Sequence, residues 1–257
     1  MRTPILECRQ ISYRHDNSSD MQLHKIDLII FENDFVSIVW PSWIGKSTLL
    51  DLIAGIKEPN QWEILFQNNI IHKTPQHLDL HSRKNVGIIF QNYGLFPRLN
   101  VQQHIEFWLN DTSKDKDTKE ETIWDILLNI WLENYRKYYP HELSWWMQQR
   151  LAVWSIIAND SPCLLMDEPF SAVDIVLRKQ MQDFITHIYR VYNKTIIFVT
   201  HQIEEAILLS NKIIVLWGKP TTIIETIDLP KWETRDLYDQ RYINLQKHIV
   251  NLIMQNQ

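Results

Sequence analysis

The sequence predicts an α/β fold built on a parallel sheet, with an N-terminal antiparallel β layer and an inserted α-helical subdomain. Short β-branched runs alternate with amphipathic stretches over much of the chain, which is the pattern of a parallel sheet. Residues 1–30 contain two runs joined by the polar turn DNSSD, which predicts antiparallel strands. Residues 100–144 change to helical spacing, which predicts the inserted helices.

The strands of the predicted parallel sheet are short and mostly apolar. We expect them at residues 35–39, 86–90, 163–166, 195–200 and 213–216. The last four runs are almost wholly apolar, as expected for strands covered by helices on both faces.

Three further segments are assigned from their spacing and charge. Residues 176–192 carry apolar side chains at helical spacing and predict a packing helix. Residues 110–121, NDTSKDKDTKEE, are charged and poor in apolar side chains, which predicts a solvated loop. Residues 242–254 predict a short amphipathic helix to which the sequence assigns no target.

The composition excludes several classes of protein. The chain has 257 residues, of which 45% are hydrophobic and 22% charged, with a net charge of −5, so a disordered chain, a collagen and a disulfide scaffold are excluded. The acidic balance gives no overall signal for nucleic-acid binding. Cys8 and Cys163 lie far apart and favour a reducing compartment. No apolar run approaches the roughly 18 residues of a membrane span, so we expect any membrane role to be peripheral.

Glycine and tryptophan occur in unusual numbers. The chain has 5 Gly and 11 Trp, whereas an average composition would give about 18 Gly. The two counts together come close to the expected number of glycines, so the excess of tryptophan matches the deficit of glycine.

A phosphate-binding loop is predicted directly after the first strand of the parallel sheet. The segment WPSWIGKSTLL contains Gly45, Lys46 and Ser47 between a strand and a helix. In such loops backbone N–H groups and a helix N-terminus bind the phosphates, the lysine reaches the β- and γ-phosphates, and the serine holds Mg²⁺. Trp40 stands where the pattern has its first glycine.

Two carboxylates follow the strand at 163–166. Asp167 and Glu168 are expected at the carboxyl edge of the sheet, where open α/β sheets bind their ligands. Buried carboxylates at a strand end are costly unless they meet a cation or take part in proton chemistry. Asp167 therefore fits a partner of Mg²⁺, and Glu168 fits a base that polarises water.

The segments LSWWMQQR, LLMDEPFSAVD and FVTHQIEEA, after the GKST loop, resemble the ATP-binding cassette (ABC) ATPases. The resemblance covers nearly the whole chain and implies a P-loop NTPase (RecA-like) core. It implies one domain over 1–257: a nucleotide-binding core with the β layer at 1–94 and 155–220, a helical subdomain at 95–154, and a C-terminal tail at 221–257.

The resemblance also implies roles for individual residues, with ATP and Mg²⁺ as the ligands. The nucleotide-binding loop is Trp40, Pro41, Ser42, Trp43, Ile44, Gly45, Lys46, Ser47 and Thr48. The catalytic residues are Glu168, His201 (the switch histidine), Gln91 and Lys46, and the Mg²⁺ ligands are Ser47, Gln91 and Asp167. The signature motif is Leu143, Ser144, Trp145, Trp146, Met147 and Gln148, and Asp174 is the acid of the D-loop.

Ser144 precedes a predicted helix and is a plausible N-cap, with the helix dipole directed at an anion. In ABC proteins this anion is the γ-phosphate held by the partner subunit, so the resemblance implies a head-to-tail homodimer with two sandwiched ATP molecules. Adenine normally stacks on an aromatic side chain of the first β-hairpin. Tyr13 and His15 both suit that role, and the sequence does not choose between them.

The branch of the family is suggested by two segments. FPRLNVQQHIEF and IIVLWGKPTTIIETIDLP are similar to importers of nitrate, sulfonate, taurine and related compounds. The resemblance then implies separate integral-membrane permease subunits, an indirect periplasmic or surface solute-binding protein, and no nucleic acid. It places the chain peripherally on the cytoplasmic face of the membrane, with residues 91–100 docking a short helix of the permease.

Two other functions compete with the importer ATPase. A soluble ABC ATPase of repair or translation would usually carry tandem cassettes or long insertions, which this chain lacks. A degenerate cassette that binds nucleotide without hydrolysis is the stronger competitor, because Trp43, Trp145 and Trp146 stand where the family has glycine. Glycine there permits φ > 0 or a close approach to phosphate, so indoles would obstruct the site.

We therefore hypothesise that these tryptophans are misread glycines. Some bacterial lineages decode UGA as glycine, and translation with a table that reads UGA as tryptophan gives this pattern. Trp62 and Trp131 also occupy typical glycine sites of the family, beside Trp40, Trp43, Trp145 and Trp146. The remaining five tryptophans fit the pattern less clearly: Trp108, Trp124, Trp154, Trp217 and Trp232.

Overall fold

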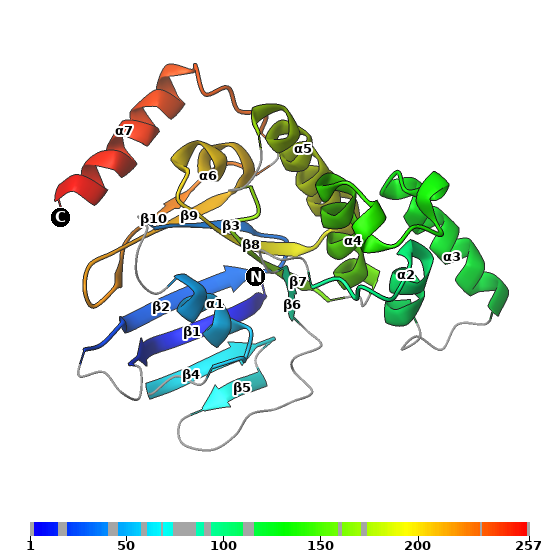
Figure 1. Ribbon diagram of the computed structural model, residues 1–257. Helices are drawn as coiled ribbons and strands as arrows, with labels where there is room; N and C mark the ends of the chain where they lie inside the picture. The colour runs from blue at the N-terminus through cyan, green and yellow to red at the C-terminus, as the bar shows by residue number, and fades with distance from the viewer. Residues whose placement is uncertain are drawn as a thin grey trace.

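A computed structural model describes most of the chain, and its elements are shown in Figure 1. It describes residues 3–14, 20–40, 46–57, 61–67, 69–73, 86–89, 94–109, 116–158, 161–170, 174–231 and 233–255. No helix among these residues is long and apolar enough to span a membrane.

The strands form two sheets. An antiparallel sheet of order β2-β1-β4-β5 contains β1 (Pro4–Tyr13), β2 (Leu23–Phe31), β4 (Gln61–Phe66) and β5 (Asn69–Lys73). A second sheet of order β10-β9-β3-β8-β7-β6 contains β3 (Phe35–Val39), β6 (Val86–Ile89), β7 (Cys163–Asp167), β8 (Thr195–Thr200), β9 (Lys212–Trp217) and β10 (Thr222–Asp228). The five strands β9, β3, β8, β7 and β6 are parallel, and β10 is antiparallel to β9 at the edge.

The described residues form seven α-helices. They are α1 (Lys46–Ile53), α2 (Val101–Leu109), α3 (Lys116–Asn129), α4 (Trp145–Ala158), α5 (Ile175–Tyr192), α6 (Ile203–Leu209) and α7 (Gln240–Gln255), all within the described ranges. Short 3-10 turns at Glu133–Tyr135 and Pro140–Glu142 join α3 to α4. In Figure 1 the helices α2, α3 and α4 gather on one side, and α7 lies at the opposite end beside α6.

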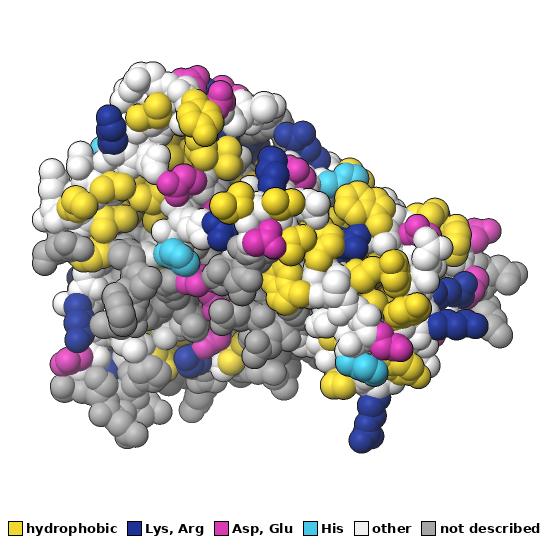
Figure 2. Space-filling model, turned by 45° about the horizontal axis from the view of Figure 1, so that its top comes forward, with side chains coloured by type: hydrophobic (Ala, Val, Ile, Leu, Met, Phe, Trp, Pro, Cys, Tyr) yellow, Lys and Arg dark blue, Asp and Glu magenta, His cyan; other side chains and the backbone are white. Residues whose placement is uncertain are grey.

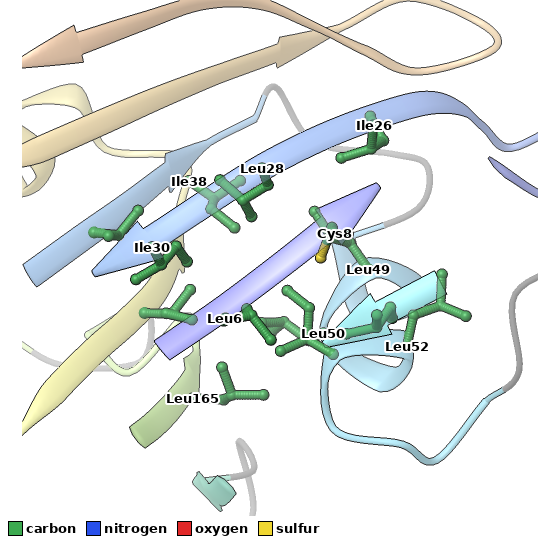
Figure 3. Close-up of a cluster of buried hydrophobic side chains, with 14 of the residues drawn as sticks. Leu6, Cys8, Ile26, Leu28, Ile30, Ile38, Leu49, Leu50, Leu52 and Leu165 are labelled. Carbon is green, nitrogen blue, oxygen red and sulfur yellow. The ribbon is translucent and has the colours of Figure 1, made fainter. Parts of the chain in front are cut away.

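One face of the parallel sheet is covered by the antiparallel sheet and α1, and not by helices alone as the sequence predicted. Figure 3 shows this core: Leu6 and Ile30 of the antiparallel sheet, Leu50 of α1, and Ile38 and Leu165 of the parallel sheet belong to one buried cluster. The antiparallel strands can serve here because alternate side chains point to one face, and that face is apolar. The other face packs against α4 and α5, with Phe184 and Ile185 of α5 buried there.

The loop predicted at 110–121 is wrong from Lys116 onward, because α3 begins there. The buried side chains Ile123, Ile126 and Leu127 recur at helical spacing and fix the helix on the subdomain core. Upstream of this anchored part Glu120 and Glu121 are exposed, and Glu120 pairs with Arg136. The start of this helix could therefore not be predicted from its charged sequence, because the helix is stabilised by the packing of its C-terminal half.

The other predicted elements are confirmed. The helix expected at 176–192 is α5, and the amphipathic tail helix is α7, whose buried side chains Tyr242 and Ile249 pack against Ala206 and Ile207 of α6. α4 continues to Ala158, beyond the expected end of the subdomain at residue 154. The domain boundaries themselves stay predictions.

Candidate functional site

The register of the parallel sheet brings three of the predicted site residues to one edge. Val39 of β3 pairs with Thr200 of β8, and Asp167 of β7 pairs with Val199 of β8. The residues that follow these strands are Trp40, Glu168 and His201. This is the carboxyl edge of the sheet, where ligands of open α/β folds bind.

Glu168 and His201 face each other at this edge. Nδ1 of His201 lies 3.5 Å from Oε1 of Glu168, and the side chains are 40% and 21% exposed. The backbone N–H of Glu168 donates to the carbonyl of Val199 at 3.0 Å. Glu168 has φ of +46°, a left-handed conformation that costs an L-residue free energy and that recurs at functional sites. The fold therefore holds Glu168 in an unfavourable backbone conformation, with its carboxylate next to the imidazole of His201.

Asp167 ends β7 and is half-buried, as is Glu168, so the carboxylates are less buried than the sequence predicted. A site open to solvent lets an anionic ligand and hydrated cation reach both side chains. Among the described residues no cluster of three or more His, Cys, Asp and Glu side chains could hold a metal ion by itself. A single Asp suits Mg²⁺, which is commonly bound through one or two carboxylates together with water and phosphate oxygens.

A helix follows the predicted phosphate-binding loop, as the order of strand, loop and helix in the sequence predicted. α1 starts at Lys46, so its N-terminus follows residues 41–45. Helix N-termini bind anions through free N–H groups and the helix dipole. Thr48 is buried and its hydroxyl donates to Oε1 of Gln22 at 3.2 Å, which fixes α1 against the segment that enters β2. Trp40 is 4% exposed and packs in the core beside α1.

The segment predicted to be the signature motif lies at the start of α4. Oγ of Ser144 accepts a hydrogen bond from the N–H of Met147 at 3.3 Å, so Ser144 caps this helix as predicted. Gln148 donates through Nε2 to the carbonyls of Pro140 at 2.8 Å and of Leu143 at 3.1 Å, which fixes the approach to the helix. Trp145 and Trp146 form its first turn and are half-buried.

Asp174 caps α5. Its Oδ1 accepts hydrogen bonds from the N–H groups of Val176 and Leu177, both at 3.0 Å. Ile175 and Val176 are 83% and 68% exposed. A helix start with two exposed apolar side chains is therefore available at the surface next to the loop that follows Glu168.

Comparison with known proteins decides the family. The sequence model described as "ABC transporter" matches residues 23–171, more than half of the chain. The chain belongs to the ABC transporter family. Within this family it is an ATP-binding cassette, the subunit whose ATPase activity is coupled to transport.

Several curated relatives cover most of this chain. An uncharacterized ABC transporter ATP-binding protein, MJ0412 of Methanocaldococcus jannaschii, is 33% identical over 90% of this chain and 84% of its own length. Spermidine/putrescine import ATP-binding protein PotA of Spiroplasma citri is 38% identical over 84% of this chain, and PotA of Oleidesulfovibrio alaskensis is 32% identical over 93%. The chain spans 60% and 62% of the length of these two PotA proteins.

Solved structures confirm the predicted P-loop NTPase fold with its β layer and helices. The cassette MJ0796, in a dimeric post-hydrolysis state with ADP and Pi, has a TM-score of 0.73 at 25% identity and covers 88% of this chain and 100% of its own. The structure of cbiO1 from Clostridium perfringens, part of the transporter complex cbiONQ, has a TM-score of 0.79 at 22% identity over 98% of this chain and 99% of its own. The second likeness shows the fold alone.

Several predicted site residues of this ABC cassette lie outside the described residues. These are Pro41, Ser42, Trp43, Ile44, Gly45 and Gln91, and also the side chains of Lys46 and Ser47. His15 lies outside them too, whereas Tyr13 is partly buried against the core cluster. The residue that stacks on adenine therefore remains open between the two.

Sequence reasoning missed three polar residues next to the site. Gln149 is fully buried and donates to the carbonyl of Pro169 at 2.9 Å, which joins α4 to the loop after Glu168. Arg178 of α5 and Glu205 of α6 contact the segment that carries His201. The signal available for Glu205 was its place in the segment FVTHQIEEA, four residues after His201.

Trp131 shows directly where the backbone favours glycine. After α3, the N–H of Leu132 donates to the carbonyl of Leu127 at 2.9 Å, and the N–H of Trp131 donates to that of Leu128 at 3.0 Å. These two bonds form a Schellman motif with Trp131 at the left-handed position, where its φ is +52°. Gly55 occupies the same position after α1, with φ of +71°.

Proposed function

We propose that this chain is the ATP-hydrolysing subunit of an importer, with Glu168 as the base that polarises the attacking water. The observation that carries the proposal is the pair of Glu168 and His201, 3.5 Å apart at the carboxyl edge of the sheet. A carboxylate in that place can accept a proton from water, and the imidazole can hold the carboxylate or a phosphate oxygen in position.

The remaining roles follow the order of the motifs. Lys46 at the start of α1 reaches the β- and γ-phosphates, and the N-terminus of α1 supplies N–H groups to them. Ser47, Gln91 and Asp167 would hold Mg²⁺, which neutralises charge that develops on the phosphates. The half-buried position of Asp167 at the end of β7 supports this assignment.

The proposed active form is a head-to-tail homodimer. Ser144 at the N-terminus of α4 is exposed, so a γ-phosphate bound by a second copy can approach this helix end. The exposed Ile175 and Val176 beside Asp174 supply apolar surface that pairing would bury. The dimeric state of the MJ0796 cassette supports the same arrangement here.

The proposed partner on the membrane side is a pair of permease subunits. Phe96 belongs to the segment 91–100 that we expect to dock a permease helix. It is 41% exposed, and its ring lies 5.0 Å from that of Phe107, which is 49% exposed. Figure 2 shows hydrophobic side chains gathered over the helical side of the molecule, at the right of the view. The exposed pair of Phe96 and Phe107 is suited to contact an apolar face of a permease helix. In this proposal the cassette lies peripherally on the cytoplasmic face of the membrane, and a solute-binding protein acts through the permease.

We propose a nitrate-, sulfonate- or taurine-like solute, on the segments FPRLNVQQHIEF and IIVLWGKPTTIIETIDLP. The printed names of the PotA relatives favour spermidine or putrescine as the second candidate. Proteoliposomes that contain the cassette and the permease encoded beside its gene test both, with labelled taurine and labelled spermidine. ATP-dependent uptake of taurine alone supports the first solute class, and uptake of spermidine alone overturns it. The matching complex with Glu168→Gln is the control for uptake that does not need hydrolysis.

We also propose that the tryptophans at positions 40, 43, 62, 131, 145 and 146 are glycines in the native protein, read from UGA. Trp131 supports this independently of any ligand, because its backbone has the conformation that Gly55 has in the same motif. Trp145 and Trp146 have no positive φ, so for them the argument is space for a phosphate and not backbone conformation. A degenerate cassette that binds ATP without hydrolysis is the alternative if the tryptophans are genuine.

The gene decides between these two alternatives. UGA codons at 40, 43, 145 and 146 support glycine, and UGG codons at these positions overturn it. The intact mass of protein purified from its native cells is an independent check, since each replacement of glycine by tryptophan adds the mass of an indole side chain.

A further inference from the structure

A buried polar cluster lies directly behind His201. Thr200 is the last residue of β8, and its Oγ1 donates to Oε2 of Glu205 at 2.6 Å. The same hydroxyl oxygen accepts a hydrogen bond from the N–H of Gln202 at 3.0 Å. The residues before and after His201 are thus tied to one carboxylate on α6.

Arg178 joins this cluster to α5. Its Nη1 donates to Oε1 of Gln202 at 2.8 Å, and its Nε lies 3.9 Å from Oε1 of Glu205. The side chain of Glu205 is 4% exposed and that of Arg178 is 28% exposed. Burial raises the pKa of Glu205, while the hydrogen bond from Thr200 and the charge of Arg178 oppose that rise. The buried carboxylate of Glu205, between Thr200 and Arg178, favours a single arrangement of residues 200–202.

From this geometry we infer that Arg178 is a positioning residue that fixes the segment 200–202 and therefore the direction of the His201 side chain toward Glu168. This inference rests on the proposed function, in which Glu168 and His201 act on the γ-phosphate. Arg178 itself does not need to touch nucleotide. It acts on the C-terminal side of His201 through Gln202. It acts on the N-terminal side through Glu205, whose carboxylate accepts the hydroxyl of Thr200.

Arg178 also links His201 to the start of α5. The N–H of Arg178 donates to the carbonyl of Asp174 at 2.8 Å, so the two residues are one helical turn apart. Arg178 therefore connects the N-cap of α5 with Gln202, the residue after His201.

The test compares Arg178→Met with Lys179→Met in a parent chain that carries glycine at 40, 43, 145 and 146. Lys179 is the next residue of α5 and pairs at the surface with Asp183, so its variant is the matched control. We expect Arg178→Met to lower kcat for ATP at least fivefold while KM stays within twofold, and Lys179→Met to leave both within twofold. Gln202→Ala removes the same contact from the other side, and the double variant should be no slower than Arg178→Met.

A second readout is independent of hydrolysis. Amide hydrogen exchange over residues 199–206 should become at least fivefold faster in Arg178→Met and in Gln202→Ala, and stay unchanged in Lys179→Met. Thr200→Ser keeps the hydroxyl and should exchange like the parent, whereas Thr200→Val should exchange faster.

Equal exchange and equal kcat in Arg178→Met and Lys179→Met overturn the inference. A rise in KM by the same factor as the fall in kcat also overturns the inference, because Arg178 would then act on the binding of ATP. A parent chain that does not hydrolyse ATP contradicts the proposed function alone, and the exchange comparison then decides whether Arg178 holds the segment.

Discussion

Oε1 of Glu168 lies 3.5 Å from Nδ1 of His201, although the two residues are separated along the chain by the whole of α5 and β8. The register of β7 and β8 produces this approach, because Asp167 pairs with Val199 and the chain leaves both strands at the same edge. At this edge Glu168 has a left-handed backbone conformation, with φ of +46°. We interpret this pair as the part of the ABC cassette that acts on water and γ-phosphate.

Glu168→Gln should trap a dimer with ATP. The amide keeps the shape of the side chain but cannot accept the proton of water, so ATP stays uncleaved between the two copies. Light scattering after size-exclusion chromatography, on the chain with glycine at 40, 43, 145 and 146, should give a dimer with ATP and a monomer without it. Glu32→Gln makes the same chemical change in the exposed turn before β3, at the opposite edge of the sheet, and should leave no trapped dimer. A monomer of Glu168→Gln at saturating ATP contradicts the sandwich.

Trp131→Gly should be more stable than Trp131→Ala by about 1 kcal/mol in the free energy of unfolding. Both variants remove the indole and its contact with Arg150, whose guanidinium lies 5.4 Å from the ring centre. They differ in the left-handed backbone, which glycine adopts without strain. Urea unfolding measures the difference, and Gly55→Ala should lose a similar amount at the matching position after α1. Equal stability of the Gly and Ala variants at 131 would show that this motif does not demand glycine.

His104 should make the stability of the helical subdomain depend on pH. Its Nε2 accepts the N–H of Phe96 at 2.8 Å and its Nδ1 lies 2.9 Å from the carbonyl of Asn100, an arrangement that needs the neutral ring. Burial lowers the pKa of His104 below its usual 6.5, against the opposing effect of its backbone hydrogen bonds. The unfolded chain therefore binds the proton more readily, and stability present above about pH 6.5 is lost as the pH falls through the folded pKa.

Urea unfolding between pH 5 and 8 checks this dependence. Each unit by which the folded pKa lies below the unfolded one corresponds to about 1.4 kcal/mol lost. His104→Gln should be less stable at pH 7.5 and should lose less on acidification, while His187→Gln, on the exposed side of α5, should follow the parent. The same loss in all three proteins would assign the pH dependence to other groups.

Much of the fold could be predicted from the sequence, because the strands of the parallel sheet are nearly continuous apolar runs. The two carboxylates after β7 could be placed at a sheet edge for the same reason, and Ser144 could be read as an N-cap from its place before α4. The start of α3 could not be predicted, since its first turns carry charge and the buried core residues named for this helix begin at Ile123, among the side chains that the structure describes. Arg178 was missed because its contact with Gln202 depends on how α5 and α6 pack, which no local pattern encodes.

The rate of ATP hydrolysis by the chain with glycine at 40, 43, 145 and 146 tests the central claim most directly. It should exceed the rate of the same chain with Glu168→Gln at least tenfold, since removal of the base removes a large factor of the catalysis. The chain with tryptophan at these four positions should show weak or no hydrolysis. A glycine-bearing chain no faster than its Glu168→Gln variant would contradict the account, as would full turnover by the chain with all four tryptophans.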